Sequence, residues 1–376
     1  MTGSSLSYTE RVEEVATSVV APHAAEVDAK GAFPRESVDA MARAGLFGLV
    51  SEREVGGMGE TPSAAVRVIE RLSQECGSTA MVMTMHYAGA TVLEKLGPEP
   101  TRRDIAAGKH LSTLAFSEAG SRSHFWAPMS TAAKINGSIQ LDAQKSWITS
   151  ARQADAYVWS SRPVSAAGAS TLWLVPAKTT GLEIPAPFDG LGLRGNDSSP
   201  VSAKGVRIPE ENRLGPDGGG FDVMMGIVLP HFQLMNAACS LGLMEAATQR
   251  TAAHAGKTRY EHLGSSLADN PTTRAYIARM RIKTDMARAL VYDAALAVEQ
   301  GRADSMLRVL ESKAAAAETA LEVTALAMRV CGGAAFRREV GVERIFRDAQ
   351  AASVMAPTTD VLYDFIGKAV CGLPLF

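Results

Sequence analysis

Histidine and cysteine side chains are the first candidates for chemistry in this sequence of 376 residues. The seven histidines show no HExxH or other paired spacing, and the four cysteines form no CxxC, so we expect no metal site. His86 and His231 could each accept a proton near neutral pH, where imidazole titrates. For His86 the competing interpretation is a hydrogen-bonded core histidine, and for His231 it is a histidine on the far face of its helix.

The composition indicates an ordinary soluble globular protein, with 46% hydrophobic and 21% charged residues. The 38 Lys and Arg residues nearly balance the 40 Asp and Glu residues, so no basic nucleic-acid-binding face is expected. We find no run of about 18 apolar residues free of charge and no apolar segment near the N-terminus. With scattered cysteines, these features predict a cytoplasmic protein that contacts neither nucleic acid nor membrane.

Residues 1–110 are predicted to form an all-helical domain. Apolar residues recur at spacings of three and four, as in Val12, Val15 and Val19. Between residues 80 and 96 the pattern is apolar nearly all round, which predicts a buried helix with His86 inside the protein.

Residues 111–214 show the pattern of short strands instead. Residues 132–142 predict a hairpin that turns at Asn136-Gly137. All four tryptophans lie in this stretch, at positions 126, 147, 159 and 173. We expect a small central β-barrel or sandwich domain of about a hundred residues.

Residues 215–376 return to a helical pattern. Asn270-Pro271 is typical of a helix start, with an N-cap followed by proline. Two apolar series, over residues 277–298 and 307–328, step alternately by three and four and predict two long, closely packed helices. The expected fold is therefore α+β, with a helical domain, a β domain and a C-terminal four-helix bundle.

Several short motifs accompany this uncommon order of domains. They are Phe33-Pro34, Gly45-Leu46, Gly56-Gly57 with Gly59, Trp147-Ile148-Thr149, LGPDGGGF at 214–221, Cys331-Gly332-Gly333 and VERIFRDA at 342–349. Taken in order over nearly the whole chain, they resemble the acyl-CoA dehydrogenase family. The resemblance implies an oxidoreductase that binds FAD between the β domain and the helical bundles and acts on an acyl thioester of CoA or a carrier protein.

The resemblance also implies which side chains hold the flavin. Trp147 would supply a flat wall, Ile148 would continue that strand, and the Thr149 hydroxyl would donate a hydrogen bond to the ring. The family's TEPxAGSD is shortened here to residues 117–122, so Arg122 stands where an acidic residue is usual. The remaining candidates in the same chain are Phe116, Ser117, Ser121, Thr358 and Asp360, the last replacing a glutamine.

Family members usually pair their subunits so that an arginine and a Gly-Gly turn of one chain reach the FAD of its neighbour. The matching residues here are Arg259, Arg329, Gly332 and Gly333. Residues 260–264 depart from the family's RxxFG spacing, and Arg329 stands where glutamine is usual. The resemblance therefore implies a homodimer or homotetramer, with an electron-transfer or reductase partner.

The usual catalytic base is missing from the sequence. Dehydrogenation of an acyl thioester needs a carboxylate to remove the α-proton. Counted from the RDA motif at 347–349, the family's YEGT segment is Met355-Ala356-Pro357-Thr358, so Ala356 replaces the glutamate. The alternative position, on the first helix of the third domain, falls at Phe232.

His231, beside Phe232, and His86, near where related flavin monooxygenases place an active-site histidine, are the candidates for a non-standard catalytic base. Glu118 lies beside the flavin strand, where the family implies a structural role. A FAD-dependent dehydrogenase with a relocated base is the favoured function. A two-component flavin monooxygenase fed by a reductase, a redox-neutral enzyme and a non-catalytic flavin-binding homologue stay open.

Overall fold

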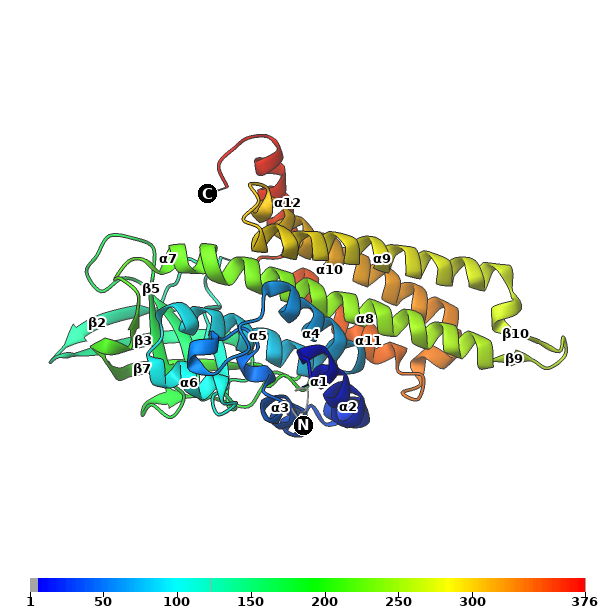
Figure 1. Ribbon diagram of the computed structural model, residues 1–376, viewed down its shortest axis with the longest axis horizontal. Helices are drawn as coiled ribbons and strands as arrows, with labels where there is room; N and C mark the ends of the chain where they lie inside the picture. The colour runs from blue at the N-terminus through cyan, green and yellow to red at the C-terminus, as the bar shows by residue number, and fades with distance from the viewer. Residues whose placement is uncertain (1–5, 123, 376) are drawn as a thin grey trace, which may run out of the picture.

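The computed structural model describes residues 6–122 and 124–375. The body is elongated, with strands gathered at one end and long helices running toward the other (Figure 1). The expected α+β class is confirmed, since helices flank a central strand-rich segment along the chain.

The N-terminal segment is helical, as predicted. Its helices are α1 (Tyr8–Val15), α2 (Ala21–Lys30), α3 (Arg35–Arg43), α4 (Pro62–Glu75), α5 (Gly77–Leu96) and α6 (Glu99–Ala106). The chain enters α1 through a capping box, in which the Ser7 hydroxyl and the Glu10 carboxylate each accept the other residue's backbone N–H. Helix α5 is buried on almost every side, which agrees with its apolar sequence, and His86 lies inside it.

The central segment forms two four-stranded sheets, with strand orders β1-β4-β5-β8 and β2-β3-β7-β6. The strands are β1 (Ser112–Ala115), β2 (Thr131–Ile135), β3 (Ser138–Ile148), β4 (Ala156–Ser161), β5 (Thr171–Pro176), β6 (Leu182–Glu183), β7 (Ser199–Pro209) and β8 (Arg213–Leu214). The predicted hairpin joins β2 to β3, and both turn residues, Asn136 and Gly137, have the positive φ that such a turn requires. The buried rings of Trp159 and Trp173 belong to the core between the sheets.

Strand β3 contains the irregularity that matters most for the site. Its side chains alternate, so that Ile139, Leu141, Ala143 and Lys145 are buried. The register with β7 then shifts between Lys145 and Ile148, and Trp147 has φ 59°. This bulge turns Ile148 into the core in place of Trp147, whose indole is left facing outward.

The C-terminal segment is built on three long helices that lie side by side (Figure 1). Its elements are α7 (Gly220–Val223), α8 (Leu229–Lys257), β9 (Arg259–Tyr260), β10 (Ser265–Ser266), α9 (Pro271–Glu299), α10 (Ser305–Cys331), α11 (Val342–Val354) and α12 (Thr359–Val370). Asn270 caps α9 as predicted, because its side chain accepts the N–H of Thr272 at 2.8 Å. Helix α12 projects from the body beside the C-terminus (Figure 1).

The helical parts share one hydrophobic core, whereas the β-sheets have a core of their own. Helices α4 and α5 pack on α8, and their side chains belong to the same buried cluster as those of α9 and α10. By length and composition, residues 220–257 and 305–336 could each cross a membrane. In the fold, 83% of the apolar 18-residue stretch of the first is buried within the protein, against 33% of that of the second. Three of the cysteines are buried, but Cys371 is exposed.

Candidate active site

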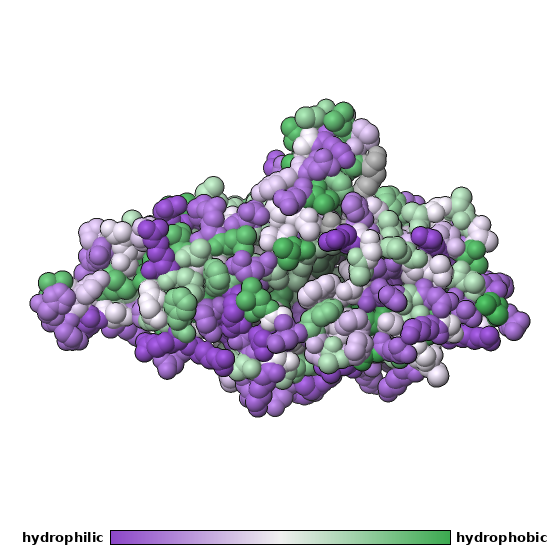
Figure 2. Space-filling model, turned by 180° about the vertical axis from the view of Figure 1, so that it is seen from behind, coloured by the Kyte–Doolittle hydropathy of each residue, from purple (hydrophilic) through white to green (hydrophobic). Residues whose placement is uncertain are grey.

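A cavity of about 770 Å³ lies where the sheets meet α5, the start of α8 and the end of α11. Six of the predicted flavin-binding residues line it, namely Phe116, Ser117, Trp147, Ile148, Thr149 and Thr358. Phe232 and Ala356, the two positions where the family would place its carboxylate, belong to the same wall. Seen from behind, the surface is hollowed at the base of the projecting α12, and hydrophobic side chains border the hollow (Figure 2).

Trp147 is the most exposed large aromatic residue in the cavity wall, at 61% of its surface. The bulge in β3 holds the indole out of the sheet, against the ring of Phe188, with 4.2 Å between the ring centroids. Phe188 comes from the irregular stretch between β6 and β7, and no pattern in the sequence singled it out. The two rings are tilted by 32° and pack against each other, so Phe188 supports an indole that is itself largely exposed and available to stack on a planar ring system.

Beneath this wall, a buried ion pair anchors β3 to the loop that follows β1. The Lys145 ammonium lies 2.6 Å from the Glu118 carboxylate, and both side chains are almost fully buried. The carboxylate also accepts the N–H groups of Met129 and Ser130 and the Ser130 hydroxyl. Lys145 and these hydrogen bonds hold the pKa of Glu118 below its usual value against the opposing effect of burial.

The RDA motif holds the loop that completes the cavity. The buried Asp348 carboxylate accepts the backbone N–H of Leu193 at 2.6 Å, and Arg347 pairs with Asp28 of α2 at 2.6 Å. Burial raises the pKa of Asp348 to about 6. Because Leu193 lines the cavity, this motif acts by positioning the wall rather than by chemistry.

The turn that carries Ala356 is held from below by a buried lysine. Lys313 of α10 is fully buried and donates to the carbonyls of Met355, at 2.9 Å, and Pro357, at 2.6 Å. No carboxylate among the described residues forms an ion pair with it, and burial lowers its pKa to about 7. Lys313 therefore fixes the position of the 355–358 turn at the cavity.

His86 is not part of the cavity wall. Its Nδ1 accepts the backbone N–H of Ser112 at 3.2 Å, which leaves Nε2 to donate to the carbonyl of Phe47 at 3.1 Å. The ring is fully buried, and burial lowers its pKa to about 3. Both nitrogens of the neutral ring are thus used to join α5 to two other segments, which is the role of a hydrogen-bonded core histidine.

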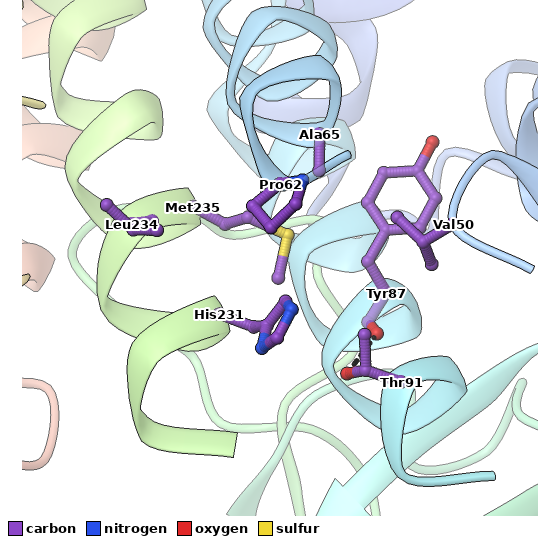
Figure 3. A pocket seen from close by; sticks show the side chains of 8 residues that line it. All are labelled: Val50, Pro62, Ala65, Tyr87, Thr91, His231, Leu234 and Met235. Atoms are coloured by element: carbon purple, nitrogen blue, oxygen red, sulfur yellow. Dashed lines mark hydrogen bonds between the residues drawn. The ribbon is translucent and has the colours of Figure 1, made fainter. Parts of the chain in front are cut away.

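His231 also lies apart from the cavity. It points from α8 toward Tyr87 and Thr91 of α5 and lines a separate pocket of about 10 Å³ (Figure 3). Its Nδ1 lies 2.7 Å from the carbonyl of Ile227, and burial lowers its pKa. A pocket of this size holds at most about one water molecule, so a substrate does not reach this ring there.

The other predicted cofactor residues fall into two groups. Ser121 and Asp360 are close in sequence to the wall residues Arg122 and Thr358 but are not themselves in the cavity wall. Arg259 follows the far end of α8, roughly 40 Å along the helix from Phe232 at 1.5 Å per residue. Arg329, Gly332 and Gly333 lie at or just beyond the last turn of α10, so the structure brings none of these four residues to the cavity of their own chain.

Part of the apolar wall was missed by the sequence analysis. The cavity is also lined by Met81 and Met85 of α5, by Phe125 of the loop between β1 and β2, and by Leu229 of α8. The phenyl rings of Phe116 and Phe125 stack with their centroids 6.3 Å apart. The apolar sequence of α5 showed that the helix is buried, but its even distribution gave no sign of which side chains face a cavity rather than the core.

The cavity fits a flavin by the chemistry of its donors. It offers the uncovered aromatic wall of Trp147 and Phe188 together with the hydroxyls of Ser117, Thr149 and Thr358. A flavin requires of its site an aromatic or apolar surface for its planar ring, hydrogen-bonding groups for its polar edge, and apolar surroundings. Among residues 6–122 and 124–375, no group of three or more His, Cys, Asp or Glu side chains could hold a metal ion.

Comparison with known proteins agrees with this architecture. Sequence models of the acyl-CoA dehydrogenase N-terminal, middle and C-terminal domains match residues 5–107, 113–206 and 218–371. The probable acyl-CoA dehydrogenase YngJ of Bacillus subtilis is 26% identical, with 94% of each chain covered. The short-chain specific mitochondrial acyl-CoA dehydrogenase of Sus scrofa is 28% identical, with 93% of this chain and 85% of the relative covered.

Solved structures show the same fold. The glutaryl-coenzyme A dehydrogenase complex with glutaryl-CoA is 25% identical and superimposes with a TM-score of 0.91, covering 99% of this chain and 98% of the other. The prolyl acyl carrier protein oxidase AnaB is 17% identical, with a TM-score of 0.88 and coverage of 96% and 97%. With three domain models matched in order over most of its length, the chain belongs to the acyl-CoA dehydrogenase family of oxidoreductases.

Proposed function

We propose that the chain is an FAD-dependent oxidoreductase that acts on an acyl thioester, carried by CoA or a carrier protein, with a non-standard proton acceptor. The observation that supports this most is the cavity itself. It joins an uncovered aromatic wall at Trp147 to an apolar chamber in which Phe232 and Ala356 stand at the usual carboxylate positions.

In this proposal each part of the wall has a separate task. Trp147, supported by Phe188, stacks on the flavin, while the hydroxyls of Thr149 and Thr358 form hydrogen bonds to its polar edge. The apolar chamber excludes water from the acyl group and orients it. Bound FAD supplies the chemistry of accepting two electrons from the substrate.

The proton acceptor is the part that departs from the family. Glu118 is the one carboxylate in the wall among the described residues, but Lys145 and its other hydrogen bonds keep its pKa low, which makes it a weak base. With His86 and His231 directed elsewhere, the cavity favours substrates whose departing proton is more acidic than the α-proton of a simple saturated acyl thioester.

Anaerobic titration of the FAD-loaded protein with a panel of acyl-CoA and acyl-carrier thioesters tests the proposal. We expect at least one thioester to bleach the flavin in proportion to the substrate added. A panel that includes 2-hydroxyacyl and 2-aminoacyl thioesters and leaves the flavin oxidised throughout would refute the proposed function.

Restoring the carboxylate provides a matched experiment. Ala356→Glu places a carboxyl group in the cavity wall at the family's usual position, and Ala356→Gln is its uncharged control. We expect the glutamate variant, but not the glutamine variant, to gain exchange of the α-proton of a saturated acyl thioester with deuterium from solvent. Equal exchange in both variants would show that position 356 is not close to the substrate's α-carbon.

A flavin-dependent monooxygenase is the second candidate, favoured by the apolar side chains at positions 232 and 356, because oxygen transfer needs no carboxylate there. With a reductase partner and isotopically labelled oxygen gas, this candidate predicts label in the product. Formation of hydrogen peroxide alone, with unlabelled product, would argue against it.

We further propose a homodimeric or homotetrameric assembly in the cytoplasm, coupled to an electron-transfer or reductase partner. Arg259, Arg329, Gly332 and Gly333 do not line the cavity of their own chain, and in the proposed assembly they reach the FAD of a neighbouring copy. Large apolar side chains exposed on α9, Ile282 at 58% and Met286 at 67%, are suited to such a contact.

A further inference from the structure

Three charged side chains line the large cavity, and two of them are neutralised within the protein. Glu118 is paired with Lys145 at 2.6 Å. Arg194 is paired with Asp189 at 2.7 Å, and its Nε donates to the carbonyl of Asp28 at 2.9 Å. Neither side chain therefore has a free charge to offer to a ligand.

Arg122 is the third charged side chain, and it has no such partner. It is exposed, it lines the cavity, and no hydrogen bond or ion pair joins its guanidinium to any other described residue. The cavity wall thus presents one uncompensated positive charge, in a loop close to solvent. A guanidinium group forms bidentate hydrogen bonds with a phosphate or a carboxylate, so the group that Arg122 is suited to bind is an anionic group of a ligand.

The backbone at this position does not itself favour arginine. Arg122 has φ 52°, in the left-handed region where Gly, Asn and Asp are enriched and where other side chains carry a modest conformational cost. No hydrogen bond or ion pair of the side chain within the described protein offsets this cost. The guanidinium is therefore available to an anionic group of a ligand.

We propose that Arg122 binds the phosphate that joins pantetheine to its carrier, and that it selects phosphopantetheine thioesters as substrates. This inference rests on the proposed function, since it assumes an acyl thioester in the cavity. The 4′-phosphate is common to coenzyme A and to carrier proteins, so one arginine serves either source.

The exposure of Arg122 distinguishes this phosphate from a carboxylate on the acyl group. A carboxylate on the acyl group would lie in the apolar chamber beside Phe232 and Ala356, whereas Arg122 is exposed. The carrier arm is the part of the substrate that must pass from the chamber to solvent.

Binding of three probes to the FAD-loaded protein tests the proposal by calorimetry. The probes are pantetheine, which has no phosphate, 4′-phosphopantetheine and coenzyme A. For Arg122→Gln we expect about tenfold weaker binding of both phosphorylated probes, equivalent to about 1.4 kcal/mol, and unchanged binding of pantetheine. Arg122→Lys should recover part of the loss, and higher salt should narrow the difference between wild type and Arg122→Gln.

Arg207→Gln is the matched control, because Arg207 is exposed on β7 and does not line the cavity. It removes the same charge from the same part of the protein and should leave all three probes unaffected. Thermal melting of each variant shows whether it is folded.

Several results would overturn the assignment. They are equal weakening of pantetheine and 4′-phosphopantetheine, an effect on coenzyme A alone, an equal effect in Arg207→Gln, or a weaker affinity for FAD in Arg122→Gln. Wild-type protein that binds none of the probes would overturn it as well. Because binding is measured without turnover, a flavin that no thioester reduces refutes the proposed function while leaving a phosphate-dependent effect of Arg122 visible.

Discussion

A lysine buried without a carboxylate partner is costly unless it gives up its proton. Lys313 is such a residue, and its two hydrogen bonds to the carbonyls of Met355 and Pro357 match the two N–H groups of a neutral amine. Burial lowers its pKa from 10.5 to about 7. The turn beside the cavity is therefore held by an amine that titrates near neutral pH.

This pKa shift predicts a stability that depends on pH. Between about pH 7 and 10.5 the unfolded chain keeps a proton on Lys313 that the folded chain has released, so the free energy of unfolding should rise with pH across this window. The rise at this site approaches about 1.4 kcal/mol per pH unit within the window. Urea unfolding of wild type and Lys313→Met at pH 7 and pH 9 measures it.

The wild type should gain stability relative to Lys313→Met on going from pH 7 to pH 9. Lys204→Met is the control, since it makes the same substitution at a side chain that is 74% exposed. A constant difference for Lys313→Met would mean that the buried group stays protonated throughout.

The lowered pKa of His86 predicts that the stability of the fold depends on pH in the acidic range. Its folded pKa of about 3 lies below the usual 6.5, so between these values the unfolded chain binds a proton that the folded chain does not, and stability should be lost as the pH falls. His86→Gln leaves the N–H of Ser112 without its acceptor and should lower the free energy of unfolding at pH 7 by about 1–3 kcal/mol.

The same variant should keep its FAD content and the pH profile of its activity. A variant of normal stability that has lost turnover would instead place His86 in the chemistry. Turnover as a function of pH, together with the fluorescence of bound flavin and urea unfolding at pH 7 and pH 5, separates these outcomes.

At the scale of residues, the sequence predicted the parts of the cavity wall at the ends of β1 and β3, together with Thr358, and little of the rest. Phe116, Ser117, Trp147 and Thr149 follow from local motifs. The partners of His86 are 39 and 26 residues away in sequence, so its core role could not be derived from local pattern. The match of Lys145 to Glu118, 27 residues apart, depends in the same way on tertiary packing.

At the scale of elements, the bulge in β3 decides what the cavity can bind. Without the shift between Lys145 and Ile148, alternation would direct Trp147 into the core. Trp147→Ala should weaken FAD binding about tenfold, because the flavin loses its stacking wall, while stability changes by less than about 1 kcal/mol at a side chain that is 61% exposed. Trp147→Phe should retain most of the affinity.

Flavin fluorescence titration of the apoprotein measures the dissociation constant, and urea unfolding measures stability. An equal loss of both in Trp147→Ala would indicate that the indole supports the fold instead of the flavin. Unchanged FAD affinity would remove Trp147 from the cofactor site.

Elements with a strong period or a local turn signal were predictable. The alternating steps of three and four marked α9 and α10, and Asn136-Gly137 marked the β2–β3 hairpin. The stretch between β6 and β7, which supplies Phe188 and Leu193, has no period. Its position is set by the hydrogen bond from Leu193 to Asp348 of α11, 155 residues away, which no local pattern could predict. The predicted domain limits near residues 110 and 214 stay predictions.

At the scale of the whole molecule, exposed apolar residues on α9 predict an assembly. Ile282→Asp combined with Met286→Asp puts two charges into the proposed contact and should convert the oligomer to monomers, with loss of FAD if the neighbouring chain helps to hold it. Light scattering after size exclusion and the flavin-to-protein ratio measure both effects.

Leu6→Asp is the control, since Leu6 is 50% exposed and lies outside α9. Wild-type protein that is monomeric and retains stoichiometric FAD would contradict the assembly. Monomers of the double variant with full FAD would show that Arg329 and the Gly332-Gly333 turn do not serve a neighbour.

The core shared by α5 and α8 also constrains how the protein is made. Helix α5 ends at Leu96, yet α8, on which it packs, begins at Leu229. At about 5–20 residues per second, the ribosome needs roughly 7–27 s to add the intervening residues. During that interval the face of α5 that packs on α8 has no partner, although α4 and β1 already cover other faces, so the nascent chain is expected to need a chaperone until α8 has emerged.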